Sequence, residues 1–199
     1  MGILKNITEE YFGETVRKED KIDLTSLDVE IVSFTDNNGN IHRRGYKPKD
    51  KNNLQELLGR MIEVRGYEGD FNDIDTSDIT DMSSLFEDVD IFNGDITGWD
   101  VSKVENMKYM FYNAESFNQP IGNWNVSKVT NMIGMFYHAK SFNQPIGDWD
   151  VSSVINIGGM FYYTTSFNQD LSKWNLNGKK KSYLFYKCPI KKEYTPKMK

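Results

Sequence analysis

The sequence predicts an α/β fold, a right-handed solenoid in which each unit combines a short strand with a short helix. Three observations predict it: a 25-residue unit repeats without gaps, each unit begins with alternating apolar and polar residues, and a helical apolar pattern follows. A single unit cannot bury its own apolar residues, so neighbouring units have to stack against one another.

The repeat is clearest from Trp99, where 25 residues read WDVSKVENMKYMFYNAESFNQPIGN. The unit from Trp124 reads WNVSKVTNMIGMFYHAKSFNQPIGD, and the unit from Trp149 reads WDVSSVINIGGMFYYTTSFNQDLSK. The preceding unit starts at Ile74, and a fifth unit begins but ends after a few residues. Residues 74–176 are therefore predicted to hold four repeats and the start of a fifth.

The apolar spacing within a unit fits the strand template of a leucine-rich repeat, whose period is about 20–29 residues. Residues 124–127 alternate apolar and polar side chains, as a strand with one buried face does. Met107, Met110 and Phe111 recur at the spacing of one helix face. We expect each unit to be leucine-rich-repeat-like, with a strand, a turn, about two turns of helix and a return loop.

The consensus WDVSxVxNMxxMFxxAxxFNQPIxx resembles the BspA-like leucine-rich repeats of bacteria, in the branch of mycoplasma-type lipoprotein repeats. The resemblance covers residues 74–176. Relatives in that family are often exposed on the cell surface and act in adhesion or recognition, so the resemblance implies a cell-surface adhesin as one possible role.

The segments that flank the repeats are predicted to cap them. Residues 1–48 are expected to hold a helix over 3–18 and a β-hairpin with strands 27–34 and 41–46.

A capping helix is predicted in residues 49–73, with Asp50 or Asn52 at its start. Residues 177–199 are predicted to be a C-terminal cap and basic tail, since lysines keep the end of a solenoid soluble.

Composition narrows the function classes. The chain has 199 residues and a net charge of −5; its single cysteine, Cys188, excludes a disulfide framework and a thiolate metal cage. Its two histidines lie far apart, and no phosphate-loop, dinucleotide-binding or zinc-protease motif occurs. We therefore expect no catalytic residues, no cofactor and no metal, and the simplest location is the cytoplasm, or the cell surface if a signal segment precedes this sequence.

Asparagines recur at two positions of the unit and are interpreted as structural. Equivalent side chains in stacked units lie about 4.7–4.9 Å apart, a spacing at which amides form hydrogen-bonded ladders. The first column is Asn106, Asn131 and Asn156, and the second is Asn93, Asn118, Asn143 and Asn168.

Two candidate binding surfaces remain. One is a concave face with positions that differ between units, where Lys103 and Lys128 share one position and Asn123 and Asp148 another. Beside them runs a column that includes Asp100 and Asp150. The other candidate is a convex edge that carries Tyr112, Tyr137 and Tyr162, a residue type enriched at interfaces.

The leading hypothesis is a non-catalytic protein–protein interaction module with a protein partner, and without a membrane, direct nucleic-acid or small-molecule partner. Two alternatives stay open. One is the cell-surface adhesin, and the other is an acidic decoy that inhibits a nucleic-acid-binding protein. The decoy hypothesis depends on charge, because 13 acidic and 5 basic residues give residues 74–173 a net charge of −8.

Overall fold

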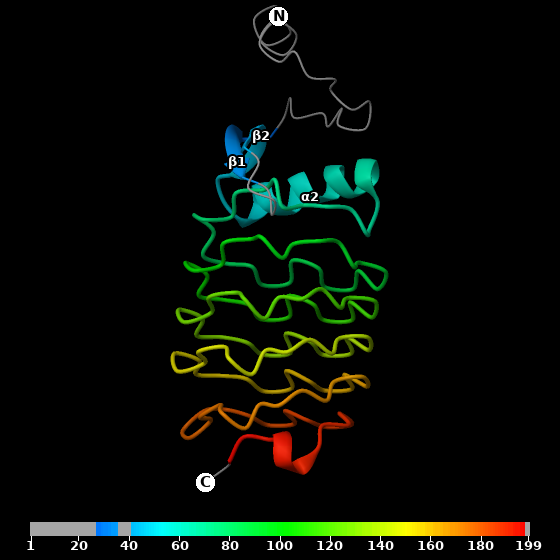
Figure 1. Ribbon diagram of the computed structural model, residues 1–199, viewed down its shortest axis with the longest axis vertical. Coiled ribbons are helices and arrows are strands. Elements are labelled where there is room, and N and C mark those ends of the chain that lie inside the picture. The colour runs from blue at the N-terminus through cyan, green and yellow to red at the C-terminus, as the bar shows by residue number, and fades with distance from the viewer. Residues whose placement is uncertain (1–26, 36–40, 198–199) are drawn as a thin grey trace, which may run out of the picture.

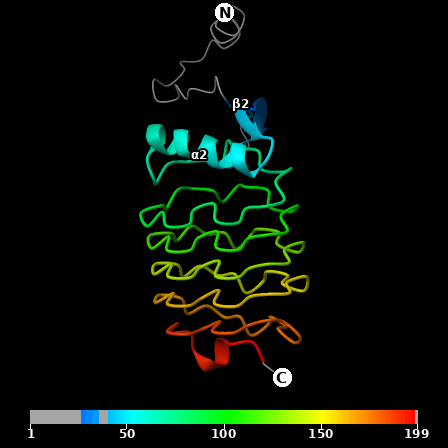
Figure 2. The same cartoon turned by 180° about the vertical axis from the view of Figure 1, so that it is seen from behind.

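The repeats stack one upon another along a long, nearly straight axis (Figures 1 and 2). The computed structural model describes residues 27–35 and 41–197, with side chains for 27–32 and 45–197. The helix predicted over residues 3–18 lies outside this range. Each 25-residue repeat forms one layer of the stack.

A hairpin and a helix occupy the N-terminal end of the stack. Strands β1 (Val29–Thr35) and β2 (Ile41–Pro48) pair antiparallel, with Val29 opposite Pro48. Tyr46 joins β2 to the first layer, because its N–H donates to the Asp73 carbonyl at 2.8 Å and its carbonyl accepts from the Asp75 N–H at 2.8 Å. The hairpin is thus hydrogen-bonded to the repeats.

Helix α2 (Lys51–Arg65) lies across the first layer. Asp50 caps it, since its carboxylate accepts from the Asn53 N–H at 3.0 Å. The helix ends at Gly66, whose φ of 79° suits a residue without a side chain. Its buried residues are Leu54, Leu57, Leu58 and Met61, which cover the apolar end of the stack.

Neighbouring layers are joined through alternate backbone N–H groups. Those of Met107, Tyr109 and Phe111 each donate to a carbonyl of the next layer at 2.9 Å. The intervening N–H groups stay within the layer, as when Tyr112 donates to the Tyr109 carbonyl at 3.1 Å and closes a turn. In this segment, therefore, half of the N–H groups form hydrogen bonds to the next layer and half form turns within their own layer.

The short helix and strand predicted in every unit are wrong. Between residues 66 and 191 the structure has only turns and isolated parallel bridges, for example Asn106 with Asn131 and Asn131 with Asn156. A helix keeps all its N–H groups within one segment, whereas this backbone sends alternate groups to the next layer. Tyr109 and Asn113 also adopt φ values of 59° and 56°, which are incompatible with a right-handed helix.

Columns of aromatic rings fill the centre of the stack. Phe111 and Phe136 lie 5.6 Å apart between ring centroids, and Phe117 and Phe142 lie 6.0 Å apart. Trp124, predicted to face the core, is 4% exposed. The helical spacing therefore marked the buried side chains, although the backbone that carries them is not a helix.

The two asparagine columns form different hydrogen bonds. In the second column the Asn118 Oδ1 accepts from the Asn143 N–H of the next layer at 3.0 Å. In the first column the Asn106 Oδ1 accepts from Lys108 N–H of its own layer at 3.1 Å. The ladder between layers exists only for the second column, whose asparagine oxygens accept from a backbone N–H and from a glutamine side chain of the next layer. The first column shapes turns.

Candidate functional site

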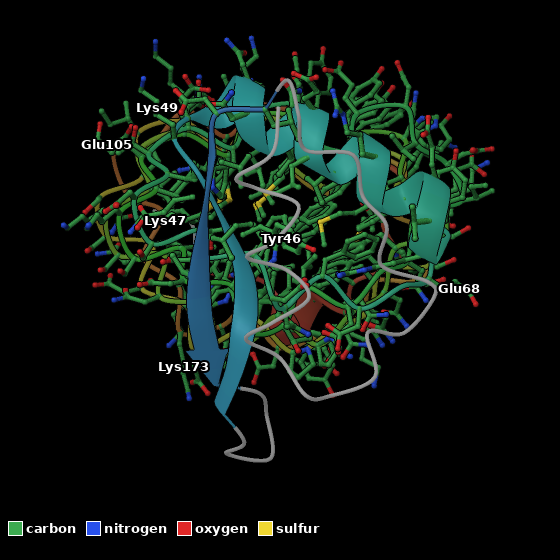
Figure 3. The ribbon with its side chains drawn as sticks, turned by 90° about the horizontal axis from the view of Figure 1, so that it is seen from above. Tyr46, Lys47, Lys49, Glu68, Glu105 and Lys173 are labelled. Carbon is green, nitrogen blue, oxygen red and sulfur yellow. The ribbon has the colours of Figure 1, made fainter. Side chains whose placement is uncertain are left out.

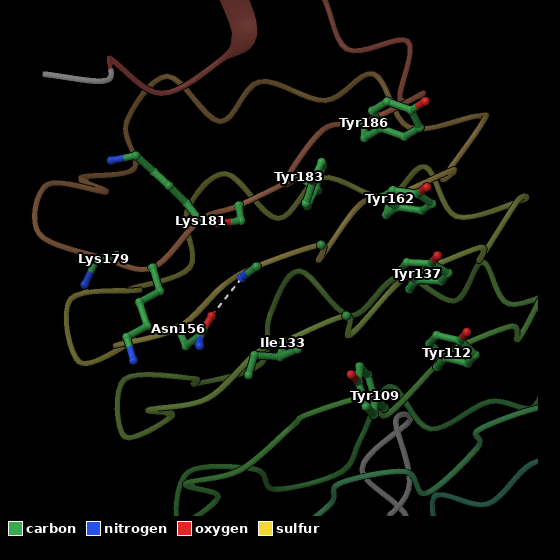
Figure 4. Close-up of a pocket in the computed structure, with 15 residues that line it drawn as sticks. Tyr109, Tyr112, Ile133, Tyr137, Asn156, Tyr162, Lys179, Lys181, Tyr183 and Tyr186 are labelled. Atoms are coloured by element: carbon green, nitrogen blue, oxygen red, sulfur yellow. Dashed lines mark hydrogen bonds between the residues drawn. The ribbon is translucent and has the colours of Figure 1, made fainter.

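A column of stacked tyrosines runs along one side of the molecule (Figure 4). Each tyrosine follows a phenylalanine that is buried, or partly buried in the last layer, so that when the phenylalanine points inward its neighbour lies at the surface. The tyrosine column consists of Tyr112, Tyr137, Tyr162 and Tyr186, and its consecutive ring centroids lie 4.7, 4.4 and 4.9 Å apart. Three of these rings belong to the predicted convex edge, and Tyr186 extends it by one layer.

Beside the tyrosine column lies a second column with left-handed backbone. Tyr109, Gly134, Gly159 and Tyr183 occupy equivalent places in four successive layers, with φ values of 59°, 57°, 62° and 57°. The two central layers carry glycine, so no side chain stands there, while tyrosines stand in the layers on either side. The surface is therefore open over Gly159 and bounded by Tyr109 and Tyr183 (Figure 4).

The two columns line an open groove of about 1130 Å³. Its opposite side is formed by Ile133, Asn156 and the chain at residues 179–182. The Lys179 ammonium donates to the Ser152 and Val154 carbonyls at 2.9 and 2.6 Å, and burial lowers its pKa. The groove thus has a fixed basic margin opposite an aromatic wall.

Three tyrosine hydroxyls of the column keep their protons at neutral pH. Removal from water raises the pKa of Tyr112, Tyr137 and Tyr162 above the usual 10.0. The wall therefore presents neutral hydroxyl groups, which donate and accept hydrogen bonds.

A protein-family model matches residues 52–174 and, in an overlapping second match, residues 104–194. The chain belongs to the family described as Mycoplasma protein of unknown function, DUF285. The groove lies within the matched residues. Neither the curated proteins nor the solved structures contain a match to the chain.

The charged residues predicted as a concave binding face do not line this groove. They lie on the edge formed by residues 98–103 and the equivalent residues of the other layers. They are partly engaged with each other: the Lys103 ammonium lies 2.6 Å from the Asp78 carboxylate, and Lys173 lies 2.6 Å from Asp148. Lys173 appears on the side of the stack that also bears Lys47 and Glu105 (Figure 3). Because the stack is nearly straight, this face is not markedly concave.

The remaining predicted positions on that edge are exposed, and several shape turns. Asp100 and Asp150 accept from the N–H groups of Ser102 and Ser152 at 2.9 Å. Asn123 donates to the Thr97 carbonyl at 3.3 Å, and Lys128 is exposed without an ion pair among the described residues. These residues are brought into register along one edge, but they line no groove with the tyrosines.

Sequence reasoning did not find the glycines or lysines of the groove. The replacement of Tyr109 by Gly134 and Gly159 at one position of the repeat is visible in the sequence and indicates a gap in an aromatic column. Lys179 and its neighbours lie in the fifth, degenerate unit, where no repeat register assigns them a place.

Two further properties hold for the residues that the structure describes. No group of three or more His, Cys, Asp or Glu among them is arranged to hold a metal ion. None of their helices has the length and apolar character needed to cross a membrane.

Burial raises the pKa of Cys188 to about 11, so its thiol stays protonated at neutral pH.

Proposed function

We propose that this chain is a non-catalytic protein-binding module, built as a solenoid, and that its partner occupies the tyrosine-lined groove. The observation that carries the proposal is the tyrosine column on the wall of the 1130 Å³ groove. Tyrosine offers a large contact area and a polar tip while losing little conformational entropy on binding. The charged edge is the weaker candidate, because its cross-layer ion pairs already satisfy Lys103 and Asp148.

We also propose that the repeats belong to the BspA-like branch of leucine-rich repeats. The 25-residue period and the consensus around WDVS and FNQPI support this assignment. The family membership described above is compatible with it at a coarser level.

The proposal is tested with two variants that alter one surface each. The groove variant is Tyr137→Ala with Tyr162→Ala, and the edge variant reverses charge at Lys103, Lys128 and Asp148. Proteins from the native cell are captured on the immobilised wild-type chain and identified by mass spectrometry, and dissociation constants are then measured with the purified partner. We expect the groove variant to bind at least about tenfold more weakly, which corresponds to about 1.4 kcal/mol, and the edge variant to bind as wild type does.

A stability control separates lost contacts from lost folding. Tyr137→Phe with Tyr162→Phe keeps the stacked rings and removes only the hydroxyls, so it should fold as stably as wild type. Wild-type affinity in the groove variant, combined with loss in the edge variant, would move the interface to the charged edge. A strong salt dependence of partner binding would instead support the acidic decoy.

A further inference from the structure

The C-terminal end of the stack presents a row of unpaired backbone donors. In the preceding layer, the N–H groups of Ile157, Gly159, Phe161 and Tyr163 donate to carbonyls of the last layer at 2.8–3.0 Å. The equivalent donors of the last layer face the end of the stack. They belong to Lys181, Tyr183, Phe185 and Lys187, and none has an acceptor among the residues that the structure describes.

The rest of this end is covered. The Leu171 N–H donates to the Tyr194 carbonyl at 2.8 Å, and the Lys191 N–H donates to the Asn168 Oδ1 at 3.0 Å. The chain after residue 188 therefore lies against residues 168–171 and leaves the donor row open. We call the open segment, residues 181–187, the donor edge.

The opposite end of the stack is closed differently. Helix α2 packs over the first layer, and Lys51 donates to the Ser83 hydroxyl at 2.7 Å. That end would offer the carbonyls that complement the donor edge, but the helix lies on them. A second copy of the chain is therefore a poor occupant: its donor edge would bring donors against donors, and its acceptor end is covered.

Two aromatic columns also stop at the donor edge. Phe185 stacks on Phe161 at 5.7 Å and Tyr186 stacks on Tyr162 at 4.9 Å, but no ring of a further layer stacks on either among the described residues. Tyr186 is 45% exposed and Tyr183 is 71% exposed. An added segment would find both a hydrogen-bonding row and an apolar surface there.

The positive charge of the C-terminal end favours an acidic partner. Residues 174–199 contain eight lysines and one glutamate, a net charge of +7. Among the described residues, Lys180, Lys187 and Lys192 form no ion pair. An anionic segment would be attracted to this end, whereas a basic one would be repelled.

We propose that an acidic, extended segment of a partner protein binds the donor edge as one further layer. Its carbonyls accept from the four free N–H groups, an apolar side chain covers Phe185, and its carboxylates face the lysines. This is recognition by strand addition, in which backbone hydrogen bonds supply affinity and side-chain contacts supply specificity. The inference rests on the proposed protein-binding function. The donor edge adjoins the groove, whose lining includes Lys181, Tyr183 and Tyr186, but the two central layers of the groove lie outside it.

The probe is a synthetic peptide with the sequence of residues 80–90, TDMSSLFEDVD. It carries four acidic residues, and its Phe86 stands where successive layers place the ring that stacks on the preceding phenylalanine. Backbone amide exchange of the full chain is followed by NMR with and without this peptide. We expect the amides of Lys181, Tyr183, Phe185 and Lys187 to exchange at least about tenfold more slowly when the peptide is bound.

The intervening amides are the internal reference. Those of Leu184, Tyr186 and Cys188 already donate within the layer at 3.1–3.3 Å, so their exchange should change little. A peptide with the acids replaced by amides, TNMSSLFQNVN, should bind at least about tenfold more weakly, as should the acidic peptide to the Lys187→Glu variant. Lys128→Glu, on the distant edge, should bind the acidic peptide as wild type does.

The outcomes separate this inference from the proposed function. The Tyr112→Ala, Tyr137→Ala variant alters the groove but keeps Tyr162, on which Tyr186 stacks, so its donor edge should still be protected when the peptide is added. Unchanged exchange at the four amides, or equal protection by a single-stranded oligothymidylate, would overturn the donor-edge proposal while leaving the groove untouched. Protection in alternate amides with no effect of groove variants on the captured partner would retain the donor edge and overturn the groove.

Discussion

Tyr109 and Gly134 occupy the same left-handed conformation in adjacent layers, yet only glycine adopts it freely. For a residue with a side chain, the left-handed region costs roughly 1–2 kcal/mol. Tyr109 is held there by its neighbours, since its ring lies 5.3 Å from that of Tyr112 and 4.7 Å from the Lys108 ammonium. The same ring leans over Gly134, where a Cβ would come within 2.6 Å of it.

Gly134→Ala is therefore expected to destabilise the protein by about 1–3 kcal/mol, through backbone strain and overlap with the Tyr109 ring. Urea unfolding measures the loss. The double variant Gly134→Ala, Tyr109→Ala removes the overlap and keeps the strain at residue 134, which shows how much the ring contributes.

The matched control is Gly59→Ala in helix α2. A Cβ at Gly59 meets nothing within 4 Å, and the position is inside the helix. This change should stabilise the protein by about 0.5–1 kcal/mol. If both alanine variants unfold at the same urea concentration as wild type, the left-handed assignment at Gly134 is incorrect.

At the scale of elements, the same apolar spacing occurs in helix α2 and in the turns of the repeats. Met107, Met110 and Phe111 are buried as a helix face would be, but they lie on consecutive turns. Periodicity reports which side chains share a face, and that part of the fold was readable from the sequence. It does not report where an N–H finds its acceptor, and here the acceptors lie one layer away.

The candidate site was predictable to a similar extent. The tyrosine column follows from the repeat, because equivalent positions in stacked units must lie side by side. The groove beside this column was not predictable. It depends on left-handed turns at Tyr109 and Tyr183, and tyrosine rarely adopts this conformation. Helix α2 was easier to predict from the sequence. Asp50 marks its start, the leucine spacing its buried face and Gly66 its end.

The cap of helix α2 gives a direct test. Asp50→Ala removes the acceptor for the Asn53 N–H and should lower the free energy of unfolding by about 0.5–2 kcal/mol. Asn52→Ala, an exposed change within the first turn, should cost nothing measurable. Equal losses in the two variants would show that Asp50 does not act as the cap.

The second asparagine column is expected to hold layers together more strongly than the surface turns do. Asn118 accepts from both the Asn143 N–H and the Gln144 side chain at 3.0 Å. Asn118→Ala leaves the Asn143 N–H without its acceptor and should cost about 1–3 kcal/mol in thermal or urea unfolding.

Asn125→Ala is the control, because Asn125 accepts only from Ser127 of its own layer and is exposed. It should cost clearly less. A larger loss for Asn125 than for Asn118 would assign the stacking role to the turns.

At the scale of the whole molecule, successive layers are linked by charge as well as by backbone. Lys103 with Asp78, Lys140 with Glu115 and Lys173 with Asp148 each pair residues one layer apart, at 2.6–2.7 Å. All are largely exposed, so each contributes little in isolation. All three links are lost when their carboxylates are protonated.

Acid should therefore weaken the stack within a defined pH range. Hydrogen bonds from Lys103 and Lys47 lower the pKa of Asp78 to about 2, and hydrogen bonds from Ser152 and Ser172 lower the pKa of Asp150 and Asp170. A carboxyl whose pKa is lower in the folded than in the unfolded chain stabilises the fold above its unfolded value of 3.8 and loses that effect as the pH falls toward its folded value. The melting temperature should thus change little from pH 7 to about pH 5 on account of these groups and should fall between about pH 4 and pH 2.

Asp78→Asn tests the contribution of the most shifted carboxyl. The variant should melt at a lower temperature than wild type at neutral pH, and the difference should shrink between pH 4 and pH 2, because wild-type Asp78 loses its charge there. Added salt should also reduce the difference at neutral pH, since the pair with Lys103 is exposed to solvent. A difference that stays constant from pH 7 to pH 2 would mean that the ion pairs of Asp78 do not lower its pKa in the folded chain, and that the layers are held in register by backbone and ring stacking alone.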